Sequence, residues 1–243
     1  MIRTIYWFVY FWLYLICVLP VYFRLKSMAK KGQTEQVQQI VDREVSKWAR
    51  SLIKLAGGKV TVEGLENIPK DRAVLFVSNH QGAFDIPLLL GYLDRPHGMV
   101  AKISTQKLPF VSTWMKLLHC VFIDRDNPRA SMRSLNEATQ NIEDGHSMVI
   151  FPEGTRARGK EVGPFKGGTM RIALKCKAPI VPVVIDGTWH MLEKRKLITP
   201  ANITLKVLPA IDTGALTKEE AKDLNEAIRQ QIIDTKNALK KEQ

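Results

Sequence analysis

The chain of 243 residues is long enough for one well-buried domain, and its 36 Lys and Arg residues against 24 Asp and Glu residues give a formal charge of +12. This excess predicts an anionic partner, such as a membrane surface, a phosphorylated substrate, an acidic carrier protein or nucleic acid. Nucleic acid is disfavoured because no zinc-finger spacing, RNP motif or helix-turn-helix pattern stands out, and three widely spaced cysteines favour reduced thiols over a disulfide framework.

The first predicted element is an uncharged run over residues 4–23, rich in Tyr, Trp, Phe, Leu and Val. Its length suits a hydrocarbon core about 30 Å thick, and spanning, re-entrant and surface-lying geometries all stay open. A cleaved signal peptide is the alternative, because residues 27–29 offer a small-x-small pattern. The run exceeds a usual signal core, and Arg24 and Lys26 intervene, so a retained anchor is favoured. Basic residues within 24–31 predict a cell-membrane location with the rest of the chain on the cytoplasmic side.

An amphipathic helix is predicted from Thr34 to about Gly57, where apolar residues recur at helical spacing. The apolar positions are Val37, Ile40, Val41, Val45, Trp48, Leu52 and Ile53. We favour packing of this face against the domain core over contact with a membrane.

Beyond residue 58, short apolar runs alternate with helical patterns, which predicts an α/β fold with a single central mixed sheet covered by helices. The expected strands are residues 60–62, 73–78, 98–101, 121–123, 147–151, 180–185 and 203–207. The most distinct expected helices are residues 129–143, 169–177 and 218–240.

His80 and Asp85 directly follow the predicted strand 73–78. A neutral imidazole accepts a proton from a hydroxyl near pH 7, and a carboxylate fixes its tautomer. On one continuous helix these two positions do not share a face, so they meet only if His80 lies in the strand-to-helix turn and Asp85 near the helix start. Pro87 suits such a first turn. An Asp85 N-cap beside an ordinary loop histidine is an equally open alternative from spacing alone.

Residues 151–156, Phe-Pro-Glu-Gly-Thr-Arg, follow another predicted strand. Ligands bind beyond the carboxyl ends of strands in open α/β sheets. Gly154 allows close backbone approach, and Arg156 has a planar fork suited to phosphate oxygens. The alternative is an ordinary polar turn with a surface arginine.

Four motifs together resemble the signature of the glycerolipid acyltransferase family. They are HxxxxD at 80–85, FIDR at 122–125, FPEGTR at 151–156 and VPVVI at 181–185. HxxxxD alone arises often by chance, whereas the ordered set of four is specific. The similarity covers about residues 60–210 and is greatest to the family's lysophosphatidate acyltransferases. The departures, Ala157 for a frequent serine and Cys120 for a frequent glycine, remove no charged group.

The resemblance implies an O-acyltransferase of phospholipid synthesis. Such an enzyme moves a fatty acyl group from acyl-CoA or acyl-carrier protein to the sn-2 hydroxyl of lysophosphatidic acid. His80 is then the general base and Asp85 its partner, with the oxyanion on backbone N–H groups at the start of the following helix. No nucleophilic residue is needed, and no cofactor is expected. The other histidines show no metal-ligand spacing, so no metal site is expected.

The resemblance also assigns the acceptor phosphate to Arg125, Glu153, Gly154, Thr155 and Arg156. Lys102, at the end of the strand 98–101, is a further phosphate candidate, with a solvated lysine as its alternative. Pro182 is expected to shape a pocket or acyl channel. Residues 1–57 are then a membrane-associated helical pair, and residues 58–243 the catalytic domain.

Two rival functions stay open. The acceptor is a different lysolipid in one, such as lysophosphatidylglycerol or a lyso-ornithine lipid. The other is a basic membrane-binding protein without catalysis. The donor, the chain-length preference and the oligomeric state also stay open.

Overall fold

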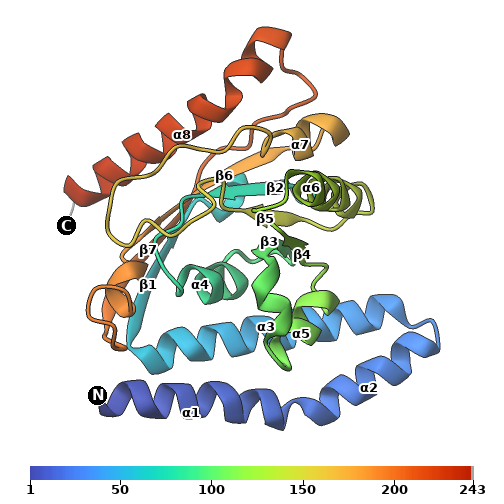
Figure 1. The fold of residues 1–243 in the computed structure, drawn as a ribbon, viewed down its shortest axis with the longest axis vertical. Coiled ribbons are helices and arrows are strands. Elements are labelled where there is room, and N and C mark those ends of the chain that lie inside the picture. The colour runs from blue at the N-terminus through green and yellow to red at the C-terminus, as the bar shows by residue number, and fades with distance from the viewer. Residues whose placement is uncertain (242–243) are drawn as a thin grey trace.

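In a computed structural model that describes residues 1–241, the strands form one mixed sheet with helices on both faces (Figure 1). The strands are β1 (Gly58–Glu63), β2 (Leu75–Ser78), β3 (Gly98–Lys102), β4 (Val121–Ile123), β5 (Met148–Ile150), β6 (Ile180–Asp186) and β7 (Ala201–Val207). Their order is β1-β7-β6-β2-β5-β3-β4, and all neighbours are parallel except β6 and β7. The expected sheet and each expected strand are confirmed.

The expected helices are present as well. The α-helices are α1 (Ile2–Cys17), α2 (Leu19–Lys30), α3 (Thr34–Ala56), α4 (Asp85–Tyr92), α5 (Val111–Leu117), α6 (Pro128–Glu143), α7 (Arg171–Cys176) and α8 (Lys218–Lys241). Short 3₁₀ helices are η1 (Leu65–Asn67), η2 (Ile103–Lys107) and η3 (Thr188–Met191). Local signals set the ends: Asn127 caps α6 by accepting the Ala130 N–H at 3.0 Å, and Gly57 ends α3 with φ 85°.

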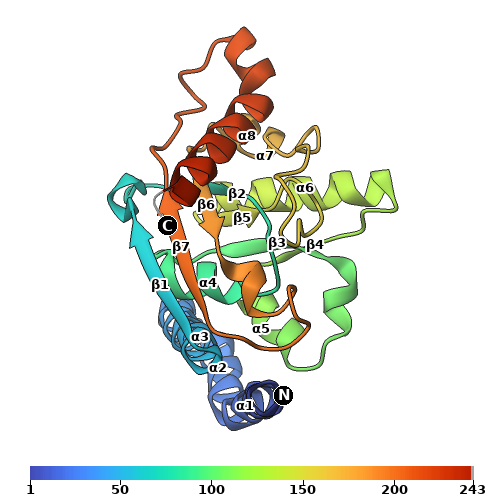
Figure 2. The same cartoon turned by 90° about the vertical axis from the view of Figure 1, so that its left-hand side faces the viewer.

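The sheet is buried on both faces, and its side chains alternate between two apolar cores. Phe76 of β2 points into the core shared with α3 and α4, whereas Leu75 and Val77 point into the core shared with α6, α7 and α8. Figure 2 shows these helices on opposite sides of the sheet. Burial on both faces explains why β2 and β5 read as continuous apolar runs in the sequence.

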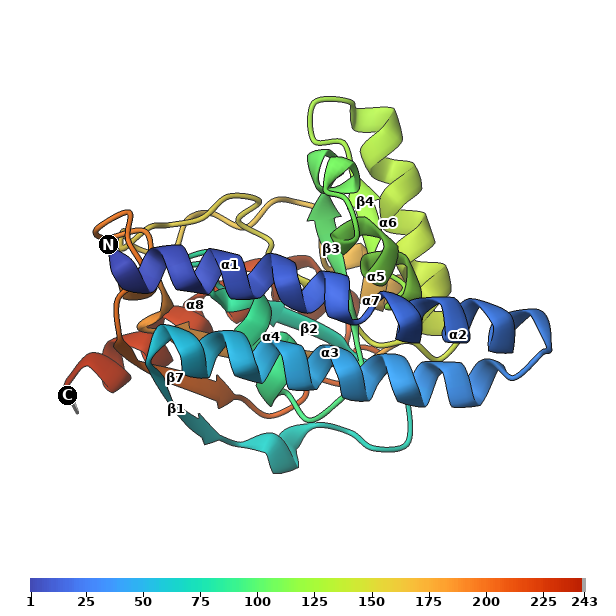
Figure 3. The same cartoon turned by 90° about the horizontal axis from the view of Figure 1, so that it is seen from below.

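The amphipathic helix α3 packs on the domain core, as favoured from the sequence. Val41, Ala49 and Ile53 on its inner face are fully buried. Outside it lies α1, which runs alongside α3 in Figure 3. The indole N–H of Trp7 donates to the Leu52 carbonyl at 2.9 Å, which ties the two helices together.

The uncharged N-terminal run forms two helices rather than one, because the α-helix is interrupted at Val18, two residues before Pro20. Residues 2–30 are the one described stretch long and apolar enough to cross a membrane, judged by length and composition. An 18-residue window in it has a mean hydropathy of 1.8 and is 11% buried. Large apolar side chains of α1 therefore face outward: Ile2, Ile5, Tyr6, Phe8, Val9, Trp12, Leu13 and Ile16.

Candidate active site

The carboxyl ends of four parallel strands bring the sequence motifs to one edge of the sheet. Strands β2, β5, β3 and β4 are parallel neighbours. His80, residues 151–156 and Arg125 follow β2, β5 and β4, and Lys102 is the last residue of β3. Residues more than 70 positions apart in the sequence therefore lie together at the carboxyl edge of the sheet, where ligands bind in open α/β folds.

His80 and Asp85 form the expected hydrogen-bonded pair, with His80 Nδ1 2.6 Å from Asp85 Oδ2. Because an ionised carboxylate only accepts, Nδ1 carries the proton and Nε2 keeps its lone pair. His80 lies in the turn after β2, and Asp85 is the first residue of α4. The Asp85 side chain is completely buried, and that of His80 is 12% exposed.

The N-cap alternative for Asp85 is wrong. Asp85 Oδ2 accepts the N–H groups of Gln81, at 2.6 Å, and Gly82, at 2.9 Å, both of which precede it. Its Oδ1 accepts the hydroxyl of Thr188. The carboxylate is therefore held by the turn before α4 and by a distant loop, not by the N–H groups of the helix that it begins.

The FPEGTR segment fixes the plane and the backbone of His80. The Phe151 ring stacks on the imidazole with ring centroids 4.0 Å apart and an interplanar angle of 17°. The His80 N–H donates to Glu153 Oε1 at 2.7 Å, and the His80 carbonyl accepts the Ala157 N–H at 2.7 Å. The first and third motifs therefore fold into one unit.

Glu153 departs from the expected phosphate role. Its side chain is buried, and its second oxygen accepts the Gly163 N–H at 2.9 Å, so both oxygens bind backbone donors. A carboxylate so engaged repels a phosphate rather than binding it. Burial raises the pKa of Glu153, opposed by these hydrogen bonds and by the charges of His80 and Lys236. Its geometry is that of a brace for the His80 backbone.

Four other residues expected to contact phosphate lie at the same edge. The Arg125 guanidinium donates to the Gly154 carbonyl, and burial lowers its pKa. Arg156 Nη1 lies 3.6 Å from Glu193 Oε1, and the arginine side chain is 43% exposed. Thr155 is exposed next to it.

Lys102 stands at the end of β3, the strand beside β4 and β5. Its side chain is exposed, and its ammonium has no hydrogen-bond or ion-pair partner within residues 1–241.

Sequence reasoning missed Lys166, whose side chain packs across Gly154. The Cε atom of Lys166 lies 2.8 Å from the position that a Cβ on Gly154 would occupy. The sequence signal that could have indicated Lys166 as a site residue is its position directly before two glycines, at residues 167 and 168.

Three backbone N–H groups in the turn before α4 are occupied by carboxylates. Those of Gln81 and Gly82 donate to Asp85, and that of Ala83 donates to Glu193 Oε1 at 2.7 Å. The turn before α4 therefore points its donors at two carboxylates. The expected oxyanion donors at the start of α4 stay a prediction.

The last residue of β6 and the connection from β6 to β7 supply site residues that lie outside all four motifs. Thr188 bonds Asp85, and Asp186 Oδ1 accepts the Gln81 side-chain N–H at 2.9 Å. Glu193 lies in the same connection. Their one signal in the sequence is that they follow the fourth motif.

Pro182, expected to shape a pocket or acyl channel, lies inside β6, where its carbonyl accepts the Leu208 N–H. It does not line the apolar cavity described next.

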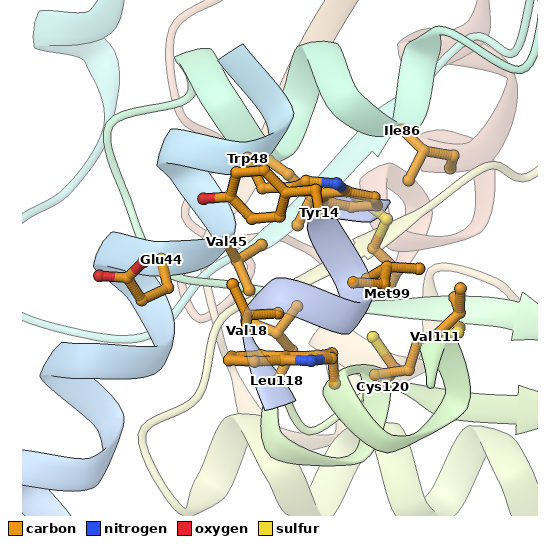
Figure 4. Close-up of a pocket in the computed structure, with 14 residues that line it drawn as sticks. Tyr14, Val18, Glu44, Val45, Trp48, Ile86, Met99, Val111, Leu118 and Cys120 are labelled. Atoms are coloured by element: carbon orange, nitrogen blue, oxygen red, sulfur yellow. The ribbon is translucent and has the colours of Figure 1, made fainter. Parts of the chain in front are cut away.

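An apolar cavity of about 120 Å³ lies beside α4, between the sheet and the N-terminal helices (Figure 4). Ile86 and Leu90 of α4 line it together with Trp48 of α3 and Met99 of β3. The carboxylate of Glu44 at its rim points away from the cavity in Figure 4. Cys120 also lines it, and burial raises the pKa of its thiol to about 12, which keeps the sulfur protonated at neutral pH.

Comparison with known proteins identifies a family and a fold. A family model described as Acyltransferase matches residues 59–186. The chain is 32% identical over 200 residues to a probable 1-acyl-sn-glycerol-3-phosphate acyltransferase of Mycoplasma pneumoniae, covering 78% of this chain and 75% of the relative. It is 33% identical over 187 residues to the 1-acyl-sn-glycerol-3-phosphate acyltransferase of Borreliella burgdorferi, covering 76% and 75%.

A solved structure is similar over nearly the whole chain. It is the crystal structure of the 1-acyl-sn-glycerophosphate (LPA) acyltransferase PlsC from Thermotoga maritima. The TM-score is 0.83 at 32% sequence identity, with 97% of this chain and 95% of that chain covered. The similarity therefore includes the N-terminal helices as well as the sheet.

Proposed function

The chain belongs to the acyltransferase family, and we propose that it transfers a fatty acyl group from an acyl thioester to the sn-2 hydroxyl of 1-acyl-sn-glycerol-3-phosphate, giving phosphatidic acid. One observation carries the proposal: a His80–Asp85 pair with a free imidazole Nε2 lies at the strand edge where Arg125, Arg156 and Lys102 gather. The base and the cations suit a substrate that has both a hydroxyl and a phosphate.

His80 is the general base of the proposed reaction. Its Nε2 takes the proton of the acceptor hydroxyl while the oxygen attacks the thioester carbonyl. Asp85 keeps the imidazole in the required tautomer and stabilises the imidazolium. The tetrahedral intermediate then expels the thiolate, and the imidazolium returns the proton to sulfur. The acceptor oxygen is itself the nucleophile, so no covalent acyl-enzyme is required.

The acceptor phosphate is proposed to lie over the loops after β4 and β5. Arg156, Arg125 and Lys102 supply the positive charge, and the exposed Thr155 hydroxyl is a further donor. Arginine binds phosphate through paired N–H donors, whereas lysine acts as a point charge. Glu153 is proposed to brace His80 rather than to contact this phosphate.

The lipid tails are proposed to enter from the side of α1 and α4. The cavity is lined by Ile86, the residue directly after Asp85, and by Leu90, and its walls are apolar. The outward face of α1 is apolar as well. We propose that α1 and α2 insert into an anionic membrane, with the rest of the chain on the cytoplasmic side. Either acyl-CoA or acyl-carrier protein is the donor.

The first test is acyl transfer from a long-chain acyl thioester to lysophosphatidic acid in detergent micelles, comparing wild type with His80→Ala. Loss of the base is expected to lower kcat by about 10³-fold or more, within the range of general-base catalysis. His146→Ala is the matched control, because His146 precedes β5 and lies at the opposite edge of the sheet. It is expected to retain wild-type activity.

Each failure of this test has its own meaning. Wild type that uses neither acyl-CoA nor acyl-carrier protein with lysophosphatidic acid contradicts the proposed acceptor, and lysophosphatidylglycerol and lyso-ornithine lipid are then tried. Full activity in His80→Ala contradicts the mechanism while leaving the family intact.

A further inference from the structure

Glu193 lies between the catalytic turn and the proposed phosphate site, although it belongs to none of the four motifs. It is in the connection between η3 and β7, and its side chain is 7% exposed. Its Oε1 accepts the Ala83 N–H at 2.7 Å and lies 3.6 Å from Arg156 Nη1. One carboxylate oxygen therefore touches both the turn that carries His80 and the arginine of the FPEGTR segment.

The second oxygen of Glu193 is packed against Gly82. A Cβ built on Gly82 would lie 2.4 Å from Oε2 and 2.8 Å from Cδ of Glu193. Glu193 can approach the backbone this closely because Gly82, inside the HxxxxD motif, has no side chain. Oε2 is buried and has no hydrogen-bond partner within the part of the chain that the structure describes. A buried, incompletely satisfied carboxylate is unfavourable unless its charge is compensated, and Arg156 supplies its one described ion pair.

We propose that Glu193 is a positioning residue for the acceptor phosphate: it orients Arg156 and fixes the distance between this guanidinium and His80. This inference rests on the proposed function and deepens it. In lysophosphatidic acid the reacting hydroxyl and the phosphate are on adjacent carbons, so the base and the phosphate ligand must be held at a fixed separation. Glu193 Oε1 joins the two parts of the site, because it contacts both the Ala83 N–H in the turn after His80 and the Arg156 guanidinium.

The end of β6 and the connection that carries Glu193 are held against the turn between His80 and Asp85. Thr188, five residues earlier, donates to Asp85, and Asp186 accepts from Gln81. Arg156 is partly exposed, so without Glu193 its long side chain samples many rotamers. Nη1 faces Glu193, and the other N–H donors of the fork are left for a phosphate.

The test compares Glu193→Gln with Glu193→Ala. The glutamine keeps an oxygen for the Ala83 N–H but loses the charge that holds Arg156, so it separates the two contacts. For Glu193→Gln we expect the KM for lysophosphatidic acid to rise about tenfold with kcat within about twofold of wild type, the size of one coupled charged contact. Glu193→Ala is expected to show the same rise in KM and a lower Tm. The matched control, Glu161→Gln, changes a 78% exposed carboxylate that pairs with Lys240 and is expected to leave KM unchanged.

A double-mutant cycle with Arg156→Ala tests whether Glu193 acts through Arg156. If it does, adding Glu193→Gln to Arg156→Ala changes the KM no further. Three results overturn the proposal: an unchanged KM in Glu193→Gln, multiplicative effects in the cycle, or a lowered KM, which would mean that Glu193 competes with the phosphate.

The same variants are titrated with lysophosphatidic acid by calorimetry in detergent micelles, without an acyl donor. The two assays separate the two proposals. Absence of turnover by wild type in the kinetic assay contradicts the proposed function. A Kd that rises in Glu193→Gln supports the positioning role independently of turnover, and a Kd equal to that of wild type overturns it.

Discussion

At the scale of single residues, Asp85 is the group on which the site depends most. It is fully buried, and its charge is compensated by four donors: the His80 ring, two backbone N–H groups and the Thr188 hydroxyl. A buried carboxylate with one donor removed keeps its desolvation penalty and loses part of the compensation. The hydroxyl of Thr188 is the donor that can be removed by an isosteric change.

Thr188→Val is expected to lower the free energy of unfolding by about 2 kcal/mol and kcat by about tenfold, because a hydrogen bond to a buried charge is lost. KM is expected to stay near wild type, since Thr188 does not reach the proposed phosphate site. Urea unfolding and steady-state kinetics measure the two effects. Thr188→Ser keeps the donor and should restore both, and a valine variant with wild-type kcat and stability would contradict the role of Thr188.

At the scale of elements, α1 combines one buried edge with a wide apolar outer surface. Trp7 and Leu15 face α3 and the core, whereas Leu13 and Ile16 are 53% and 50% exposed. A helix apolar all round either lies in the core of a protein or in a membrane. The exposed apolar surface of α1 supports the proposed insertion of this helix into a membrane.

Leu13→Glu combined with Ile16→Glu is expected to move the protein from the membrane fraction to the soluble fraction. Each acidic residue disfavours the hydrocarbon region by about 2–3 kcal/mol, and both sites are exposed, so folding is expected to change little. Sedimentation after a carbonate wash measures the distribution. The pair Leu13→Ala and Ile16→Ala is the matched control and should stay in the membrane fraction. Retention of the double glutamate variant there would argue against insertion of α1.

At the scale of the whole molecule, the two edges of the sheet differ in chemistry. The carboxyl edge carries the His80–Asp85 pair, while His97 is buried at the amino edge, just before β3. The His97 ring lies edge-on to Phe76, and its Nδ1 donates to the Arg95 carbonyl at 2.7 Å. Burial lowers the pKa of His97 to about 4. The folded protein therefore holds this histidine neutral.

This burial makes stability depend on pH in a defined window. The unfolded chain binds a proton at His97 near pH 6.5, and the folded chain only near pH 4. The stabilising contribution is therefore complete above about pH 6.5 and is lost as the pH falls toward 4. Between pH 7.5 and 5 the loss is about 2 kcal/mol. Urea midpoints at both pH values measure it. His97→Asn keeps a donor for Arg95 and should reduce the loss by this amount, whereas an unchanged loss would contradict the assignment.

The sequence by itself determined the elements and the hydrogen-bonded pair that is the proposed base and its partner. Apolar alternation and helical spacing are local properties of the backbone, so β2, β5 and α3 were predictable within a few residues. His80 and Asp85 are only five positions apart, and one turn geometry lets them meet. The N-terminal break at Val18 was missed, although Pro20 signalled it.

Only the tertiary structure decided what holds that pair in place. Thr188 is 103 positions from Asp85, and Glu193 is 110 positions from Ala83. The sheet order places β6 beside β2, which brings the connection after β6 to the catalytic turn. Glu153 was assigned to phosphate from its motif, yet the packing of the two loops turns it toward the His80 backbone. Local spacing encodes which residues can react, whereas contacts between distant segments depend on the order of strands, which no local pattern contains.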